Sequence, residues 1–223
     1  MESKGLMSSR ATLIRRSMTC RKQALCSWNG RLKMAERPAI LAIDFQEAIA
    51  RPSSPKDPRH KVLAASQAVI RQARMASVPV IFTQTLRRSD HKGAITAKTD
   101  RDKRQPPSST PKDLGEILPE LGPLPQDLVI PKYQWSPFYA TPLEMFLSRL
   151  HITTILLMGI ATNLAVESTA RDAYDRNYHC IAIADAMMGT TPEEHRFSLT
   201  YVFPRISQVM TSTAAIAWLV AKH

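Results

Sequence analysis

Asp44 and Gln46 directly follow a short apolar run, Ala39–Ile43, in the segment AILAIDFQ. A buried strand is predicted over 39–43, because the run is short, apolar and rich in branched residues. A carboxyl group at the end of such a strand is partly removed from water and can serve as a general acid or base. Gln46 is a candidate substrate-binding residue beside it. Asp44 could instead simply cap the following turn.

Lys132 follows a second apolar stretch and precedes the aromatic residues Tyr133, Trp135, Phe138 and Tyr139. An ammonium group there could hold an anion or stabilise a neighbouring carboxylate. Tyr133, Trp135 and Phe138 are candidates for lining a substrate pocket, although one or two of them are expected to belong to the core. The alternative is a surface lysine whose stem lies along packed rings while its charge stays in water.

A strand-to-helix turn is predicted at 159–163, just ahead of Ala165. Backbone N–H groups at a helix start can stabilise an oxyanion and lower the pKa of a nucleophile. Small residues in and after the turn would let a substrate approach closely. The alternative is an ordinary packed strand–helix unit. The candidate substrate-binding residues of the turn are Ile160, Ala161, Thr162 and Asn163.

Strands and helices alternate from Pro38 onward, which predicts βαβ units and a mostly parallel sheet. Ligands of such sheets bind at the carboxyl ends of the strands, where the three segments above are expected to lie. Gly159 is expected to end one strand, and Pro204 to end one helix. The predicted strands are 39–43, 78–83, 127–130, 152–158, 180–184 and 208–210, and the predicted helices are 61–75, 142–150, 164–176, 192–203 and 213–220.

Residues 86–113 are polar, basic and rich in Pro and Ser, which predicts a long surface loop of the kind that often covers an active site. Arg87 and Arg88 open this loop just past the second predicted strand. Either could bind a substrate carboxylate through paired hydrogen bonds, or simply be solvated.

Together the three segments resemble the isochorismatase-like (cysteine hydrolase) superfamily. Its members carry an Asp at the end of the first strand, a Lys ahead of an aromatic-rich Phe-x-x-Thr-x-Leu segment, and a Gly-x-x-Thr-Asn-x-Cys-Val-x-x-Thr-x-Arg-Asp-Ala run. Here Asp44, Lys132, Phe138–Leu143 and residues 159–173 (GIATNLAVESTARDA) match these features in order and spacing. The resemblance implies a three-layer α/β/α, Rossmann-like domain over 34–223 with a central, mostly parallel sheet. It also implies a homodimer or homotetramer.

By position, the resemblance implies a catalytic triad of Asp44, Lys132 and residue 165, and a cis peptide bond between Ile160 and Ala161. Residue 165 is Ala, however, and a methyl group cannot attack a carbonyl or form an acyl-enzyme. Cys180 cannot substitute, because it is predicted to lie in the next strand. The catalytic role therefore shifts to Asp44 and Lys132.

Three explanations of Ala165 stay open. The chain could hydrolyse a small polar metabolite without a covalent intermediate, with Asp44 as general acid or base and Lys132 assisting. True isochorismatases resemble it in lacking the cysteine, and they protonate a vinyl ether with a neutral Asp. Their Ala-His pair is Thr162-Asn163 here, which favours a different substrate. Alternatively, a cysteine has been replaced by alanine, or the chain is an inactive relative that binds a small ligand or a partner.

No cofactor and no metal are expected. Nicotinamidases of this superfamily hold a metal through an Asp-x-His segment after the second strand, and the corresponding stretch here, Thr83–Arg87, lacks both ligands.

The net charge of +11 is concentrated near the start of the chain, where residues 1–33 hold eight Lys or Arg and one acid. Nucleic-acid binding is therefore not indicated by the bulk charge. Residues 1–33 are predicted to be a disordered basic leader, either a presequence or an over-long gene start before Met34. The low, odd number of Cys favours a reducing compartment, so we expect a cytoplasmic protein, with mitochondria or plastids as the alternative. No apolar run is long enough for a membrane span.

Overall fold

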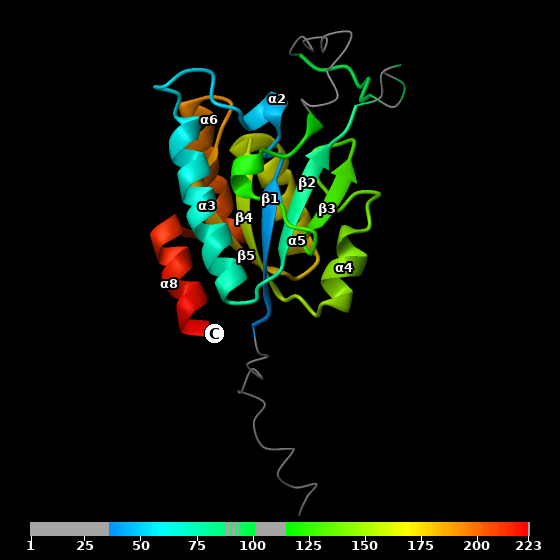
Figure 1. Cartoon of the computed structure of the whole chain (residues 1–223). Coiled ribbons are helices and arrows are strands. Elements are labelled where there is room, and N and C mark those ends of the chain that lie inside the picture. The colour runs from blue at the N-terminus through cyan, green and yellow to red at the C-terminus, as the bar shows by residue number, and fades with distance from the viewer. Residues whose placement is uncertain (1–35, 88–89, 91, 93, 101–114, 223) are drawn as a thin grey trace, which may run out of the picture. The chain divides into compact units, whose positions relative to one another are not determined.

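Six parallel strands form the centre of the domain. The computed structural model describes residues 36–87, 90, 92, 94–100 and 115–222, and Figure 1 shows their arrangement. The strand order is β3-β2-β1-β4-β5-β6, and all the strand pairs are parallel. This confirms the predicted α/β class with its parallel sheet. The strands are β1 (Pro38–Ile43), β2 (Val80–Thr85), β3 (Leu128–Lys132), β4 (Thr154–Ile160), β5 (His179–Met188) and β6 (Gln208–Met210).

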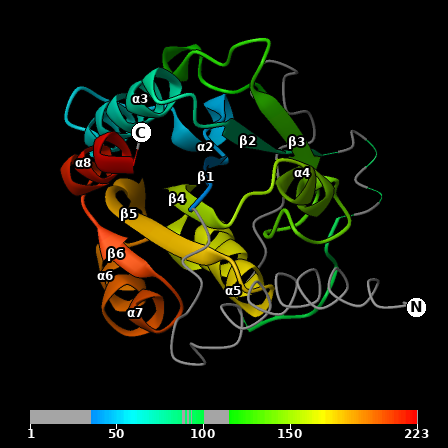
Figure 2. The same ribbon diagram turned by 90° about the horizontal axis from the view of Figure 1, so that it is seen from below.

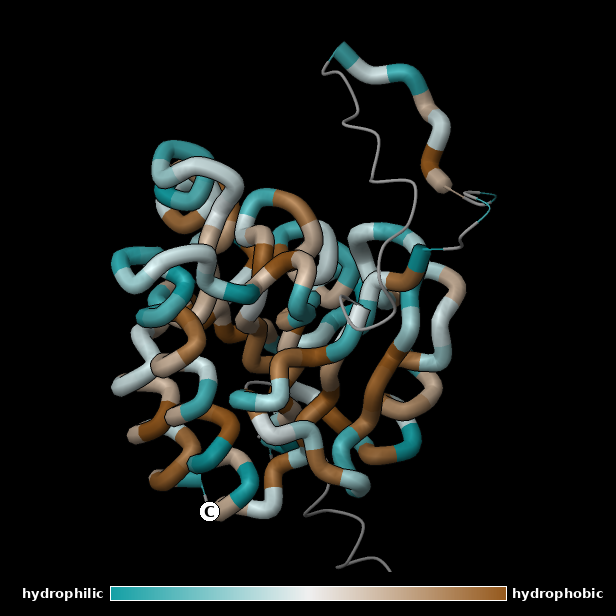
Figure 3. The backbone as a smooth tube through the Cα atoms, turned by 45° about the horizontal axis from the view of Figure 1, so that its top comes forward, coloured by the Kyte–Doolittle hydropathy of each residue, from teal (hydrophilic) through white to brown (hydrophobic). Residues whose placement is uncertain are grey.

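The central strands β1 and β4 are buried along their whole length. Helices cover both faces of the sheet, so these strands are continuous apolar runs rather than alternating ones. Figure 3 shows apolar segments at the centre of the domain and hydrophilic ones around it. The chain winds outward from β1 to β3 in one direction and from β4 to β6 in the other. The direction of winding reverses between β1 and β4, where sheets of this kind form their ligand crevice.

Two apolar clusters hold the helices on the sheet. On one face, Val69 of α3 and Leu219 of α8 pack against residues such as Phe82 of β2. On the other face, Leu147 of α4 and Phe203 of α7 pack against residues such as Leu157 of β4. The helices are α2 (Glu47–Ala50), α3 (Arg59–Met75), α4 (Leu143–Arg149), α5 (Glu167–Asp175), α6 (Pro192–Phe197), α7 (Phe203–Ile206) and α8 (Ser212–Lys222).

Three shorter helical segments complete the fold: the 3-10 turn η2 (Pro119–Leu121) and the π-helical turns η3 (Thr162–Val166) and η4 (Ser198–Val202). The turn η3 leads directly into α5, and η4 joins α6 to α7. No helix in the described part of the chain is both long and apolar enough to cross a membrane.

Several predicted element ends are wrong. Pro204 does not end a helix; it lies in the first turn of α7, where its missing N–H needs no partner. Asp185 does not follow β5 but lies inside it, and its carboxylate accepts hydrogen bonds from Ser212 at the start of α8. Pro131 lies within β3 rather than after it. A strand can contain Pro here because β3 is at the edge of the sheet, where the missing backbone N–H need not pair with a neighbouring strand.

The predicted leader, residues 1–33, lies outside the described residues, as does most of the predicted loop over 86–113, Arg88 included. The described residues from Leu86 to Asp100 contain neither helix nor strand.

Candidate functional site

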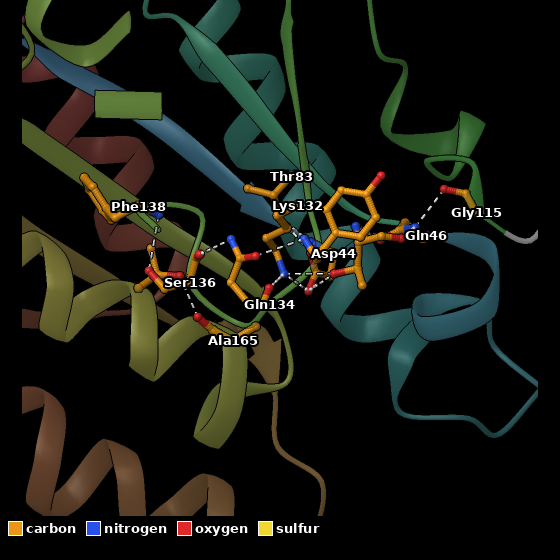
Figure 4. Close-up of polar contacts among 12 residues, drawn as sticks. Asp44, Gln46, Thr83, Gly115, Lys132, Gln134, Ser136, Phe138 and Ala165 are labelled. Carbon is orange, nitrogen blue, oxygen red and sulfur yellow. Dashed lines mark hydrogen bonds and ion pairs between the residues drawn. The ribbon is translucent and has the colours of Figure 1, made fainter. Parts of the chain in front are cut away.

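The candidate site lies where the carboxyl ends of four neighbouring strands meet. Asp44 follows β1, Thr85 ends β2, Lys132 ends β3 and Ile160 ends β4. The parallel sheet therefore brings together residues that are more than 100 positions apart in the sequence. Figure 4 shows Asp44 and Lys132 pointing toward each other at this edge.

Asp44 is almost completely buried, and protein groups contact both oxygens of its carboxylate. The Thr83 hydroxyl donates to Oδ1 over 2.7 Å, while Oδ2 accepts from Lys132 Nζ at 2.7 Å and from the Thr85 hydroxyl at 3.1 Å. The backbone of Asp44 has a left-handed conformation, with φ of 56°. Few residues other than Gly adopt this conformation, but Asp does so comparatively readily.

Lys132 is 1% exposed, and its ammonium group has three acceptors. They are Asp44 Oδ2 at 2.7 Å, Thr85 Oγ1 at 2.9 Å and the Gln134 carbonyl oxygen at 3.0 Å. Burial lowers the pKa of Lys132, and the neighbouring Asp44 carboxylate opposes that shift. Because an ammonium has only three protons, Lys132 is saturated by these contacts and serves to hold the carboxylate in place.

Thr83 and Thr85 are site residues that the sequence analysis missed. They alternate with Gln84 at the end of β2, so both side chains lie on the same face of the sheet, and both hydroxyls donate to Asp44. The signal was the change from apolar to polar residues in VIFTQT at a strand end. Gln46 is buried too, and its amide donates to the carbonyl oxygens of Thr85 and Gly115 while accepting from the Thr85 N–H.

The turn after β4 contains the cis peptide bond, between Ile160 and Ala161. The Ala161 carbonyl accepts from the N–H groups of both Leu164 and Val166, which gives the π-helical turn η3. Ala165 lies in this turn, 4% exposed, and belongs to the same apolar cluster as Phe138. Figure 4 places Ala165 below the segment that carries Gln134 and Ser136.

Gly159 allows β4 to approach the end of β1 closely. Its φ is 141°, and a Cβ atom at this position would lie 2.2 Å from the Ile43 carbonyl oxygen. Ile43 is the residue before Asp44 and pairs with Gly159 in the sheet. No larger residue fits without moving the backbone that carries the carboxylate.

A second group of polar contacts ties the turn to α6. His195 Nδ1 lies 2.8 Å from the Thr162 hydroxyl, and the Asn163 amide donates to Glu194 Oε2 at 3.1 Å. Asn163 Oδ1 accepts from the backbone N–H of Thr190 at 3.0 Å. Burial lowers the pKa of His195. The sequence analysis missed His195. The available signal was the helix start formed by Thr191 and Pro192, which comes shortly after a strand and places His195 in the first turns of the helix.

The predicted aromatic residues divide between surface and core. Tyr133 and Trp135 are about half exposed, at 51% and 54%. Phe138 is buried, with its ring 5.9 Å from that of Tyr178 and the Arg176 guanidinium 5.0 Å from its centre. Arg87 is exposed just beyond β2. Roles for these residues in substrate binding stay predictions.

Cys180 lies in β5, as predicted, and is buried. Burial raises the pKa of its thiol to about 12, so at neutral pH it is neither ionised nor accessible as a nucleophile. Within the described ranges, no three His, Cys, Asp or Glu side chains lie close enough together to hold a metal ion.

Comparison with known proteins gives one family throughout. The model of the isochorismatase domain matches residues 38–214. An uncharacterised isochorismatase family protein of Bacillus subtilis is 35% identical over 179 residues, which are 79% of this chain and 91% of that protein. A ureidoacrylate amidohydrolase of Methylorubrum extorquens is 49% identical over 70 residues, but these are only 31% of this chain and 28% of that enzyme.

Solved structures agree. An isochorismatase family protein from Burkholderia thailandensis superposes with a TM-score of 0.76 at 36% identity, over 82% of this chain and 96% of that one. The N-carbamoylsarcosine amidase of Thermoplasma acidophilum has a TM-score of 0.61 at 26% identity, over 79% and 96% of the two chains. The chain therefore belongs to the isochorismatase family of hydrolases.

Proposed function

We propose that this chain hydrolyses a small polar metabolite through Asp44 and Lys132, without a covalent enzyme intermediate. The observation that carries the proposal is the buried ion pair of 2.7 Å between these two side chains at the reversal point of the sheet. A charged pair is costly to bury and rarely adds net stability, so its place at the expected ligand crevice supports a chemical role.

In this reaction Asp44 accepts a proton from a water molecule as the water oxygen bonds to the substrate carbonyl carbon. The tetrahedral species then loses its leaving nitrogen, which takes the proton back from Asp44 as the carbon–nitrogen bond breaks. Lys132 keeps Asp44 oriented. Backbone N–H groups at the start of the helical run η3–α5 would stabilise the oxyanion.

We infer a ureido or carbamoyl compound as the substrate. Two relatives are a ureidoacrylate amidohydrolase and an N-carbamoylsarcosine amidase, whose names specify such groups. The ion pair supports the same choice. Asp44 enters it as a carboxylate, which accepts protons, whereas protonation of a vinyl ether needs a neutral carboxyl group.

A second candidate function is ligand binding without turnover. It is favoured by Ala165, because the resemblance places the nucleophile of the cysteine hydrolases at this position. All three protons of the Lys132 ammonium are also engaged within the protein, which suits a rigid binding site as well as a catalytic one.

A panel of ureido and N-carbamoyl compounds separates the two functions. Each compound is tested for ammonia release by the purified full chain and for its effect on the melting temperature. Turnover that disappears in Asp44→Asn supports the hydrolase. A compound that raises the melting temperature but is not cleaved supports the binding function. If no compound does either, the proposed substrate class is wrong.

A further inference from the structure

His195 on α6 is a partly buried residue that the proposed reaction does not use. Its Nδ1 atom lies 2.8 Å from the hydroxyl oxygen of Thr162, the first residue of η3. Thr162 is fully buried, and within the described part of the chain its hydroxyl has no other hydrogen-bond partner. A buried hydroxyl that loses its single partner costs free energy, so this contact holds Thr162 in place.

The link between β5 and α6 also holds Asn163, the second residue of η3. Asn163 Oδ1 accepts from the Thr190 N–H at 3.0 Å, and the Asn163 amide donates to Glu194 Oε2 at 3.1 Å. Figure 2 shows α6 on the same side of the sheet as α5, and α6 packs directly against η3. Both side chains that open η3 are therefore held from outside the turn, by residues of the segment 190–195.

The backbone that carries His195 is fixed by contacts of its own. A Cβ atom at Gly189 would lie 2.8 Å from both the backbone N and the Cβ of His195, so the link passes directly against this residue. Thr191 caps α6, because its hydroxyl accepts from the Glu194 N–H at 3.2 Å. His195 is therefore held independently of Thr162, as a group that positions another must be.

Thr162 and Asn163 open the helical run η3–α5, whose first backbone N–H groups are the proposed donors to the oxyanion. Within the turn, the Ala161 carbonyl already accepts from Leu164 and Val166. Those two bonds engage the N–H groups of later residues. The orientation of the first two residues therefore depends on the contacts of their side chains.

A histidine suits this role, because Nδ1 can accept from or donate to a hydroxyl while the ring stays neutral. Burial lowers the pKa of His195, which favours the neutral ring. We propose that His195 is a positioning residue, which acts through the Thr162 hydroxyl to hold the first residues of η3 in the orientation that oxyanion binding requires. The proposal rests on the proposed hydrolysis and assigns no contact between His195 and the substrate.

Steady-state kinetics of the full chain with the best ureido substrate test the role of His195. Donors aimed at an oxyanion act mainly in the transition state, so a misplaced turn lowers kcat rather than raising KM. His195→Ala and Thr162→Val should each lower kcat about tenfold or more, while KM changes by less than about twofold. The double variant should be no slower than the slower single variant, because both changes break the same contact. His195→Asn should recover most of the lost kcat, since its amide can take the place of Nδ1.

His60→Ala on α3 is the matched control and should leave kcat unchanged. His60 is exposed, and its Nε2 lies 3.1 Å from the Ser54 carbonyl oxygen, so this change also removes one histidine contact. An unchanged kcat in His195→Ala overturns the proposal, as does a loss that appears only in KM or that multiplies in the double variant. If circular dichroism shows His195→Ala unfolded, Thr162→Val gives the answer, because it removes the hydroxyl and keeps the shape of the side chain.

A second measurement needs no turnover and so separates the positioning role from the proposed hydrolysis. In Ala165→Cys the new thiol lies in η3, where backbone N–H groups at a helix start favour the thiolate. Its alkylation by iodoacetamide at pH 7 is followed by peptide mass spectrometry, which distinguishes it from the other cysteines. Adding His195→Ala should slow this alkylation at least about threefold, whereas adding His60→Ala should not.

An alkylation rate that His195→Ala leaves unchanged overturns the positioning role. Slower alkylation in a chain that cleaves no ureido compound supports the positioning of the turn and overturns only the hydrolysis.

Discussion

The Lys132 ammonium lies 2.7 Å from the Asp44 carboxylate although the two residues are 88 positions apart. Both are buried, and the hydroxyls of Thr83 and Thr85 of β2 also donate hydrogen bonds to the carboxylate. A closed arrangement of this kind makes each charge dependent on the other, because either one alone would be left in the interior without compensation.

Removing Lys132 alone should therefore be more damaging than removing both charges. Lys132→Met should lower the free energy of unfolding by about 3–5 kcal/mol, since it leaves a buried carboxylate. Adding Asp44→Asn should recover most of this loss, and Asn also tolerates the left-handed backbone at position 44. Urea unfolding of the two variants measures the difference. If the effects of the two substitutions simply add, the side chains are not coupled.

Gly159→Ala should destabilise the protein by about 2–6 kcal/mol, because the new Cβ would overlap the Ile43 carbonyl at an already unfavourable φ. Gly115→Ala is the matched control, since a Cβ at that position has nothing within 4 Å. Thermal or urea unfolding of both variants tests the comparison. Equal stability of the two would mean that β4 does not approach β1 as closely as the structure shows.

The sequence was sufficient to predict the sheet because its strands are short apolar runs separated by amphipathic helices. The strand Gln208–Met210 was predicted with its observed ends. Phe138 could be placed only as pocket or core, because that choice depends on Tyr178 and Arg176, which pack on it from elsewhere in the sequence. The four-residue helix α2 is too short to show a periodic pattern.

The site was predicted less completely than the fold. Asp44 and Lys132 were identified and lie in contact, but their threonine partners and His195 were not found. Hydrogen bonds such as that between Thr162 and His195 join residues 33 positions apart and leave no local pattern in the sequence.

His195 should make stability depend on pH. Burial lowers its pKa in the folded protein, so the unfolded chain binds the proton more readily. The stabilisation is fully present above the unfolded value, near pH 6.5, and is lost as the pH falls through the folded pKa. Wild type should therefore lose more unfolding free energy between about pH 7 and pH 5 than His195→Asn, which cannot titrate. Parallel curves for the two proteins would contradict this account.

Ala165→Cys should create amidase activity toward ureido compounds, because the resemblance places the missing nucleophile at this position. The change adds one sulfur atom to a buried residue of the apolar cluster that also contains Phe138, and we expect the fold to tolerate it. Ala165→Ser is the control of similar size with a weaker nucleophile. Mass spectrometry of a quenched reaction should detect an acyl-enzyme only in the Cys variant. Its absence in a folded variant that binds the compound would show that the turn cannot present a nucleophile.

The most direct test of the central claim compares kcat/KM of wild type and Asp44→Asn for the best ureido substrate, under conditions where circular dichroism shows both proteins folded. If Asp44 transfers the proton, kcat/KM should fall by about 10²–10⁴-fold in Asp44→Asn, mainly through kcat. The double variant Asp44→Asn/Lys132→Met, which removes the unpaired buried charge, should remain equally inactive. Turnover at the wild-type rate in Asp44→Asn would contradict the proposed mechanism.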